Sequence, residues 1–286
     1  ALVCRDCGRI ERCPNCSLPL IYHETNRTLR CHPCHVQLPL KGVCAFCKGA
    51  HQAFRGAGTQ HLEKILKEEL QDFPYQVIRI DSDVTVPKLE PGAPAAVIGT
   101  ARALSFTRWG RVGLALFADV DGFLSIPEYR ASAEFLGLCR EVRYRMDNGA
   151  PLILQSRDPD RLLLRTIASG SLGSWYKEEL SARRTLRYPP FWSILKLTYY
   201  GKSSEDALHT AQQAATTLKR LTATHKNAII TPPYVTHPPA KRGRYGAVVL
   251  LRMPATEANA QLPLLLDELN LSQNWKIDVN PLQLLS

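Results

Sequence analysis

Residues 4–47 read CRDCGRIERCPNCSLPLIYHETNRTLRCHPCHVQLPLKGVCAFC and contain four Cys-x-x-Cys pairs. Two cysteines separated by two residues present their sulfurs on one side of a tight turn, where both bind the same tetrahedral ion. Eight sulfurs in four such pairs therefore predict two structural zinc sites, each with four cysteine ligands. A disulfide scaffold is the alternative chemistry, but intracellular Cys-x-x-Cys arrays favour metal, and the sequence shows no pattern typical of a signal peptide.

The spacing of the pairs favours a nested arrangement. Sequential pairing would join the first two pairs across residues 8–12, which is a short link for two facing turns. In the nested arrangement, residues 17–30 form a hairpin between the inner pairs, with short strands within 18–29, and the outer pairs close around it. The expected ligands of the two ions are Cys4, Cys7, Cys44 and Cys47 for the first, and Cys13, Cys16, Cys31 and Cys34 for the second.

The composition is that of a globular protein with excess positive charge. Apolar residues make up 45% of the 286 residues and charged residues 22%. No apolar run approaches the roughly 20 residues that a membrane helix needs, so we expect no membrane association. Lysine and arginine outnumber aspartate and glutamate by 36 to 26, giving a net charge of +10. The charge predicts a polyanionic partner, and ribosomal or phospholipid partners would suit it as well as DNA.

After a zinc-binding ribbon at residues 1–50, the pattern predicts an α/β unit at residues 51–170. Its expected strands cover residues 76–80, 95–98, 112–117 and 152–155. Its expected helices cover residues 58–73, with Thr59 as N-cap, 127–146 and 159–168. Such alternation predicts a mostly parallel sheet covered on both faces, with Thr100, Asp119 and Asp121 at the carboxyl ends of its strands.

Residues 171–286 predict a small α+β unit. Its expected strands cover residues 191–200, 228–230, 245–253 and 275–279. Its expected helices cover residues 172–187, 203–221 and 256–269. The order from the first strand onward is βαββαβ. A proline-rich loop at 232–239 leads into the basic cluster Lys241, Arg242 and Arg244 beside Tyr245, which suits phosphates or an acidic peptide.

The sequence contains no complete nucleotide-binding loop. Gly201-Lys202-Ser203 resembles the end of one, but Lys196 stands where the first glycine would be. Without that glycine the backbone cannot wrap phosphates, so we predict a turn and a helix cap. Cys139 lies in a helical apolar pattern and is expected to be a core residue rather than a nucleophile.

Several stretches in order resemble the PriA family of bacterial replication-restart helicases. They are the cysteine array, GAGTQ at 56–60, RIDSD at 79–83, DVDG at 119–122, KRGRY at 241–245 and DVNP at 278–281. The resemblance implies a RecA-like second helicase lobe at 51–170 that carries the double zinc ribbon as an insertion. It also implies nested zinc pairing and a C-terminal domain at 171–286 that binds DNA and partner proteins.

The sequence departs from this family at its nucleotide motifs. The family's Gln-x-x-Gly-Arg-x-Gly-Arg, whose arginines stabilise the γ-phosphate, corresponds to residues 141–148, where only Arg145 remains and Asn148 replaces the second arginine. Loss of such an arginine slows phosphoryl transfer by about 10³ to 10⁵. Residues 101–106 replace the family's segment that contacts DNA and nucleotide, and the chain lacks the first lobe. We therefore expect no enzymatic activity and no use of ATP.

The resulting hypothesis is a replication restart protein that binds stalled or abandoned forks and promotes primosome assembly and loading of the replicative helicase. The alternatives are half of an active ATP-dependent 3′ to 5′ DNA helicase, and a zinc-ribbon RNA-binding factor. The expected partners are forked or single-stranded DNA, the single-stranded DNA-binding protein and other primosome proteins. We expect a monomer in the bacterial cytoplasm, associated with the nucleoid. The candidate DNA or partner contacts are Arg9, Arg12, Arg27, Arg30, Lys241, Arg242, Arg244 and Tyr245.

Overall fold

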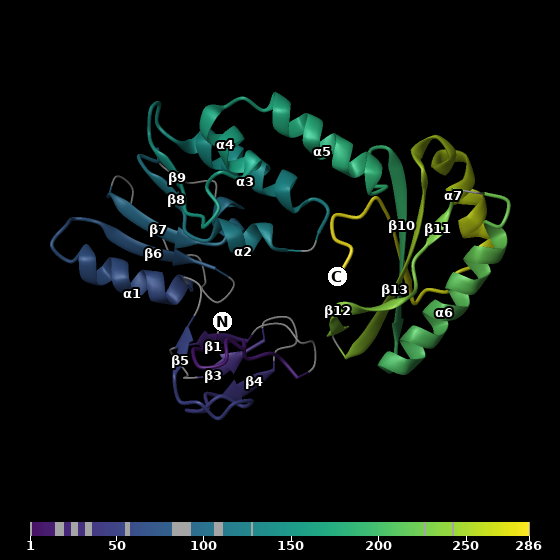
Figure 1. Ribbon diagram of the computed structural model, residues 1–286, viewed down its shortest axis with the longest axis horizontal. Helices are drawn as coiled ribbons and strands as arrows, with labels where there is room; N and C mark the ends of the chain where they lie inside the picture. The colour runs from purple at the N-terminus through teal and green to yellow at the C-terminus, as the bar shows by residue number, and fades with distance from the viewer. Residues whose placement is uncertain are drawn as a thin grey trace.

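The structure is a computed structural model that describes residues 2–14, 20–23, 28–31, 36–54, 58–81, 93–105, 111–126, 128–225, 227–241 and 243–285. Within these residues the fold is mixed α/β, with parallel and antiparallel strand pairs (Figure 1). Four of the expected site residues lie outside the described residues, namely Cys16, Arg27, Cys34 and Arg242. No helix in the described part of the chain is long and apolar enough to cross a membrane.

Short antiparallel strands surround the cysteines. They are β1 (Leu2–Cys4), β2 (Ile21–His23), β3 (Thr28–Arg30), β4 (Gln37–Pro39) and β5 (Gln52–Phe54). β2 pairs with β3, which confirms the expected hairpin, and β4 adds a third strand beside β3. β1 pairs with β5, so the ends of this segment lie together and strand pairing continues to Phe54.

Among its described residues, the middle of the chain contains two parallel strand pairs and five α-helices, the first of which precedes them. The strands are β6 (Gln76–Ile80), β7 (Ala95–Gly99), β8 (Ala115–Phe117) and β9 (Leu152–Leu154). The helices are α1 (Thr59–Glu69), α2 (Val120–Leu124), α3 (Ala131–Arg145), α4 (Leu162–Ser169) and α5 (Gly173–Thr185), with a short 3-10 helix at Ala101–Ser105. β6 pairs with β7 and β8 with β9, and in the described residues no ladder joins the two pairs. The expected single sheet is therefore seen as two parallel pairs, because the short β8 and β9 offer few positions for a further ladder.

The start of α1 differs from the prediction. Gly58, and not Thr59, occupies the N-cap position, and no side chain caps this helix. The Thr59 hydroxyl instead donates to the Asp81 carboxylate at 2.6 Å. Asp81 is only 6% exposed, and a buried carboxylate requires hydrogen-bond donors, so this long-range contact replaces the local cap.

A buried cluster of Phe135, Leu136, Leu163 and their neighbours packs α2, α3 and α4 together. Trp175 of α5 joins this cluster and is 5% exposed, so α5 is anchored on the middle of the chain although it leads toward the C-terminal strands (Figure 1). Cys139 is 2% exposed, and burial raises the pKa of its thiol to about 12. Its predicted role as a core residue is confirmed.

The C-terminal strands form one antiparallel sheet, which we call the C-terminal sheet. Its strands are β10 (Trp192–Gly201), β11 (Ile229–Ile230), β12 (Tyr234–Lys241), β13 (Arg244–Pro254) and β14 (Trp275–Val279). The order is β11-β13-β10-β14, and β12 also pairs with β13. Helices α6 (Ser204–Leu221) and α7 (Ala255–Leu269) cover one face (Figure 1). The Ser203 hydroxyl caps α6 by accepting from the Asp206 amide at 3.1 Å, which confirms the predicted turn and cap.

β12 was not expected, because residues 232–239 were interpreted as a proline-rich loop. Among the strands that the structure describes, β12 pairs only with β13, and its register shifts between Val235 and Ala240. Proline lacks an amide donor and is accommodated in strands at sheet edges and at bulges, which is where Pro238 and Pro239 lie. The element order is therefore βαβββαβ rather than βαββαβ.

The face of the C-terminal sheet opposite the helices is covered by residues 281–285. Lys196 of β10 is 1% exposed and donates to the Gln283 carbonyl at 3.0 Å, and burial lowers the pKa of its ammonium group. Tyr234 donates to the Leu284 carbonyl at 2.7 Å. From the middle of the chain, Glu128 accepts from the Leu284 amide at 2.8 Å, and Tyr129 donates to the Pro281 carbonyl at 2.9 Å. This segment therefore links the middle of the chain to the C-terminal sheet (Figure 1).

Candidate metal centre

Two turns of the same geometry carry the outer cysteine pairs. In the first turn, the Cys4 amide donates to the Arg9 carbonyl and the Gly8 amide donates to the Cys4 carbonyl, at 2.8 and 2.9 Å. In the second turn, the Cys44 amide donates to the Gly49 carbonyl and the Lys48 amide to the Cys44 carbonyl, at 2.9 and 3.1 Å. Gly8 and Lys48 both have positive φ, 71° and 61°. The chain reverses at the same position in both turns, which presents each cysteine pair on one side.

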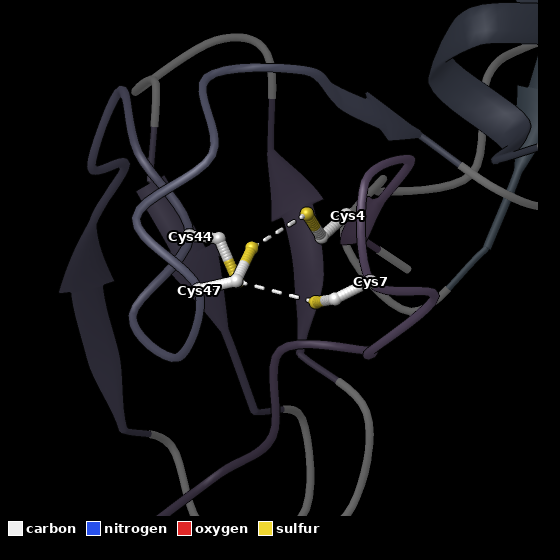
Figure 2. Close-up of side chains that lie close together, drawn as sticks. All are labelled: Cys4, Cys7, Cys44 and Cys47. Atoms are coloured by element: carbon white, nitrogen blue, oxygen red, sulfur yellow. Dashed lines mark hydrogen bonds between the residues drawn. The ribbon is translucent and has the colours of Figure 1, made fainter.

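The four outer sulfurs form one compact cluster (Figure 2). All four lie within 4.8 Å of one another. Cys4 Sγ is 3.5 Å from Cys47 Sγ, and Cys7 Sγ is 3.8 Å from Cys44 Sγ. A zinc ion bound at about 2.3 Å by four sulfurs in a tetrahedron separates them by about 3.8 Å. The cluster therefore has the size and the donor chemistry of a four-cysteine zinc site, and it joins the first pair to the last pair as the nested arrangement predicts.

Hydrogen bonds and neighbouring thiols affect the outer cysteines differently. The backbone amides of Cys47 and Phe46 donate toward the Cys44 sulfur and lower the pKa of Cys44 to about 7. The Gly49 amide acts in the same direction on Cys47, but hydrogen bonds shared with the Cys7 and Cys4 thiols, together with burial, raise the pKa of Cys47 to about 12. Four adjacent thiolates repel one another unless a cation lies among them. A divalent metal would replace the shared protons and allow every sulfur to act as a thiolate ligand.

Asp6 connects the two turns outside the sulfur cluster. Its Oδ1 lies 2.9 Å from His51 Nδ1, and its Oδ2 accepts from the His51 amide at 3.4 Å. A Cβ atom at Gly49 would overlap the Asp6 carboxylate, so only glycine allows this approach. Asp6 therefore holds the second turn against the first from a position next to the ligands, as supporting carboxylates do in metal sites.

The inner cysteine site is described in part. Cys13 and Cys31 are 2% and 1% exposed and lie in a small core with Leu2, Leu20 and Leu29. The Cys31 amide donates to the Val36 carbonyl, five residues later, at 2.9 Å. The first cysteine of each outer turn makes a hydrogen bond of the same spacing. Cys16 and Cys34 lie outside the described residues.

The expected basic contacts of the ribbon have different surroundings. The guanidinium carbon of Arg9 lies 3.3 Å from the centroid of the Phe46 ring, and Phe46 is 61% exposed between two ligands of the second turn. Arg12 is exposed, and Arg30 lies on β3. With the Gln37 amide oxygen turned toward it, Arg30 donates twice to that oxygen, at 2.8 and 3.1 Å. Arg9 with Phe46 is thus the most accessible pair of a cation and an aromatic ring among these residues.

The basic cluster at 241–245 lies at the turn between β12 and β13. Arg244 is exposed, but it donates to the Tyr200 carbonyl at 2.9 Å and to Asn274 Oδ1 at 2.6 Å. Tyr245 is 36% exposed. The side chains of Lys241 and Arg242 lie outside what the structure describes. The predicted position at one end of the sheet is confirmed for the two described side chains, and Arg244 is held by contacts within its own chain.

Arg145 and the residues expected at the carboxyl ends of the parallel strands are engaged in internal contacts. Arg145 donates to the Glu141 and Leu104 carbonyls at 3.0 and 3.1 Å and pairs with the Glu141 carboxylate at 3.0 Å. Asp119 accepts from the Gly122 amide at 2.9 Å and caps α2. Asp121 accepts from the Arg157 amide and the Ser156 hydroxyl at 2.8 and 2.7 Å, and these bonds lower its pKa. Thr100 follows β7 directly, and its carbonyl accepts from the Ala103 amide of the 3-10 helix at 2.8 Å. Arg145, Asp119 and Asp121 thus stabilise helices and loops of the chain itself through these contacts.

Three groups of residues were not identified from the sequence. Phe46 gave a signal, because it is a large apolar residue between two ligands, but it was not interpreted. The residues that hold 281–285 come from distant positions, and no local pattern links them. The third group consists of the aromatic rings of Tyr129, Phe191 and Trp192, on which three arginines pack. In the sequence, the cluster Arg183, Arg184 and Arg187 was a second basic candidate, diluted by Glu178 and Glu179, but its aromatic partners were not identified.

Comparison with known proteins identifies relatives of the chain. No family model matches it. It is 29% identical to replication restart protein PriA of Haemophilus influenzae over 296 aligned positions, which cover 93% of this chain and 40% of the relative. The PriA proteins of Borreliella burgdorferi and Bacillus subtilis are 30% and 28% identical, over 72% and 76% of this chain and 32% and 28% of their own lengths. The chain spans less than half the length of these curated relatives. It therefore belongs among the relatives of the replication restart protein PriA, to which it is similar over most of its own length.

Proposed function

We propose that the chain is a replication restart protein that binds stalled or abandoned DNA forks and promotes primosome assembly, without helicase activity of its own. The observation that carries the proposal is the outer cysteine cluster, formed by the first and last pairs, in a chain similar to PriA over 93% of its length. A zinc-stabilised ribbon and a basic C-terminal unit together suit recognition of a branched polyanion.

Two zinc ions per chain are part of this proposal. Cys4, Cys7, Cys44 and Cys47 would hold one ion, and Cys13, Cys16, Cys31 and Cys34 would hold the other. The Cys31 to Val36 hydrogen bond supports the second site, because it repeats the bond at the start of both outer turns. The ions would supply folding free energy to a ribbon whose own core is small.

We propose three units: a double zinc ribbon at 1–50, a helicase-like lobe of RecA type at 51–170, and a DNA-binding and partner-binding unit at 171–286. The parallel pairs β6–β7 and β8–β9, with helices between them, support the second unit. The antiparallel C-terminal sheet, with α6 and α7 on one face, supports the third. The packing of Trp175 against the second unit and the pairing of Phe54 with Leu2 mean that neighbouring units share contacts at these boundaries.

We base the proposed lack of helicase activity on the identity and contacts of individual residues, and not on the length of the chain. Arg145, which would contact a γ-phosphate, is held by Glu141 and Leu104, and Asn148 stands in place of a second arginine. A guanidinium already bonded to a carboxylate must break that pair before it can stabilise a phosphoryl group. Residues of the ribbon and of the 241–245 turn would bind DNA. The single-stranded DNA-binding protein is a proposed partner of the 241–245 turn.

Two measurements test the proposed function. The first is ATP hydrolysis by the purified chain with forked DNA. We expect no stimulation, and clear DNA-stimulated turnover would support the alternative of an active 3′ to 5′ helicase. The second is competition between forked DNA and structured RNA over a salt series. We expect forked DNA to compete better at every salt concentration, and preferential binding of RNA would instead support an RNA-binding factor.

A further inference from the structure

Three arginines lie against three aromatic rings where α5 leads into β10. The guanidinium carbon of Arg184 is 4.3 Å from the Phe191 ring centroid, that of Arg187 is 5.1 Å from Trp192, and that of Arg252 is 4.7 Å from Tyr188. Tyr188 also stacks on Tyr129 with ring centroids 4.9 Å apart. We call the six residues Arg184, Arg187, Tyr188, Phe191, Trp192 and Arg252 the arginine–aromatic surface.

The charge of this surface is not neutralised by carboxylates. Within the described residues, Arg184, Arg187 and Arg252 form no ion pair, whereas Arg183 one position away pairs with Glu179 at 2.7 Å. Arg184 and Arg187 are exposed, and Phe191 and Trp192 are half-buried. Arg184 and Arg187 therefore present positive charge to solvent beside the partly accessible Phe191 and Trp192, whereas Arg252 is half-buried and donates to the Leu186 carbonyl.

Arg187 occupies a position that favours glycine. It follows the last turn of α5 with a φ of 60°, and the Tyr188 amide closes the helix by donating to the Arg183 carbonyl at 2.8 Å. A residue with a side chain is less stable than glycine in this left-handed conformation. The turn alone does not require arginine here, so the guanidinium over Trp192 is the feature that distinguishes this residue.

A guanidinium stacked on a ring keeps its N–H groups at the edge, where they can bind phosphate oxygens in pairs. Aromatic rings beside such cations stack on unpaired bases, and together the two groups are typical of proteins that bind single strands. We propose that the arginine–aromatic surface binds the phosphate backbone and unpaired bases of a single-stranded nucleic acid. The inference rests on the proposed DNA-binding function and names a surface for it. The accessible rings favour a nucleic acid over an acidic peptide, which needs only the charges.

The arginine–aromatic surface is distinct from the basic cluster at 241–245. In the pairing of β10 with β13, Trp192 lies opposite Pro254 and Gly201 lies opposite Tyr245. The two positively charged regions thus lie at opposite ends of the C-terminal sheet, and a strand bound at one end does not use the residues of the other.

Binding of a labelled single-stranded oligonucleotide to the whole chain, measured over a salt series, tests this inference. The variant Arg184→Ala/Arg187→Ala removes two charges from the surface. The control Lys219→Ala/Arg220→Ala removes two exposed charges from the last turn of α6. We expect the first variant to bind about tenfold more weakly at low salt and to lower the salt slope by about 1.4, because each phosphate contact to a single strand contributes about 0.7. The control should change the slope by much less.

Trp192 provides a second readout. We expect the oligonucleotide to quench tryptophan fluorescence, and Trp192→Phe to remove most of this quenching. The variant Arg184→Lys/Arg187→Lys keeps the charge but loses the planar stacking group. Its affinity for the oligonucleotide should therefore lie between that of the unaltered chain and that of Arg184→Ala/Arg187→Ala. Thermal unfolding would verify that each variant is folded.

Several results would overturn the inference. An equal loss of affinity in the control would do so, as would unchanged tryptophan fluorescence on binding. So would a loss of binding to polyglutamate, an acidic peptide, in Arg184→Ala/Arg187→Ala with unchanged binding of the oligonucleotide. Full fork affinity in Arg184→Ala/Arg187→Ala would refute this surface and leave the proposed function standing. Failure of the unaltered chain to bind any DNA would refute both.

Discussion

At the scale of single residues, the outer metal centre depends on sulfur atoms contributed from both ends of the ribbon. Cys4 and Cys44 are 3% and 4% exposed, whereas Cys47 is exposed. The spacing of the cysteines favoured the nested arrangement, in which the first and last pairs meet, because residues 8–12 are a short link for sequential pairing. The spacing did not indicate the role of Asp6 or its close approach to Gly49, since both depend on the contact between the turns.

The first residue-scale prediction concerns zinc content. Cys7→Ser should lower the zinc content of the chain by about one ion, because three cysteines no longer complete a tetrahedral site. Elemental analysis of chelator-free protein would measure this. The control is Cys139→Ala, a buried cysteine far from the ribbon in sequence, which should leave zinc content unchanged. An unchanged zinc content in Cys7→Ser would contradict the assignment of the outer site.

The second residue-scale prediction concerns Glu128. Its carboxylate accepts from the amides of Leu284 and Leu285 at 2.8 and 3.0 Å. Glu128→Gln should destabilise the chain by about 1 to 3 kcal/mol, because an amide cannot accept all of these bonds and partly buried donors lose a partner. Urea unfolding would measure the change. Glu141→Gln, which breaks the exposed pair with Arg145, should cost no more than about 0.5 kcal/mol. Equal stability of Glu128→Gln and the unaltered chain would show that the carboxylate of Glu128 does not help to hold residues 281–285.

At the scale of elements, the sequence predicted most helices more accurately than the pairing of strands that lie far apart in the chain. The helix at 203–221 was placed correctly, because Ser203 and the charges that follow it specify its start within one turn. β12 was missed, because Pro238 and Pro239 argue against a strand unless the strand is known to lie at an edge. The parallel strands were found, but their division into two pairs depends on contacts between distant residues.

The element-scale prediction concerns the contact between α2 and the loop after β9. The Arg157 amide and the Ser156 hydroxyl hold the pKa of Asp121 below its usual value. A carboxyl group whose pKa is lower in the folded state stabilises the fold above its unfolded pKa of about 3.9, and this contribution is lost as pH falls through the folded pKa. Asp121→Asn should therefore lower the melting temperature at neutral pH, and the difference should shrink at lower pH, below about pH 4. Melting curves over this range would measure it.

The control for this prediction is Asp160→Asn. Asp160 is exposed and has no hydrogen bond or ion pair to the described residues. Its substitution should leave the melting temperature nearly unchanged at every pH. A difference between Asp121→Asn and the unaltered chain that does not depend on pH would indicate a packing effect rather than loss of the charged group.

At the scale of the whole molecule, three features support recognition of nucleic acid. The ribbon presents Arg9 on Phe46, the C-terminal sheet has positive charge at both ends, and the net charge of the chain is +10. Residues 281–285 join the middle of the chain to the C-terminal sheet through Glu128, Tyr129, Lys196 and Tyr234. This connection would keep the second and third proposed units in one fixed arrangement. A protein that contacts more than one arm of a branched DNA needs its binding units to be held in this way.

Fork recognition through the zinc ribbon is best tested by the ratio of affinities for forked DNA and linear duplex of equal length. We expect the unaltered chain to prefer the fork, and Cys7→Ser to lose much of this preference while it keeps most of its duplex affinity, because the remaining positive charge still attracts DNA. Fork recognition by the ribbon would be refuted by equal affinity of the unaltered chain for fork and duplex, or by an undiminished preference in a Cys7→Ser protein shown to lack one zinc ion.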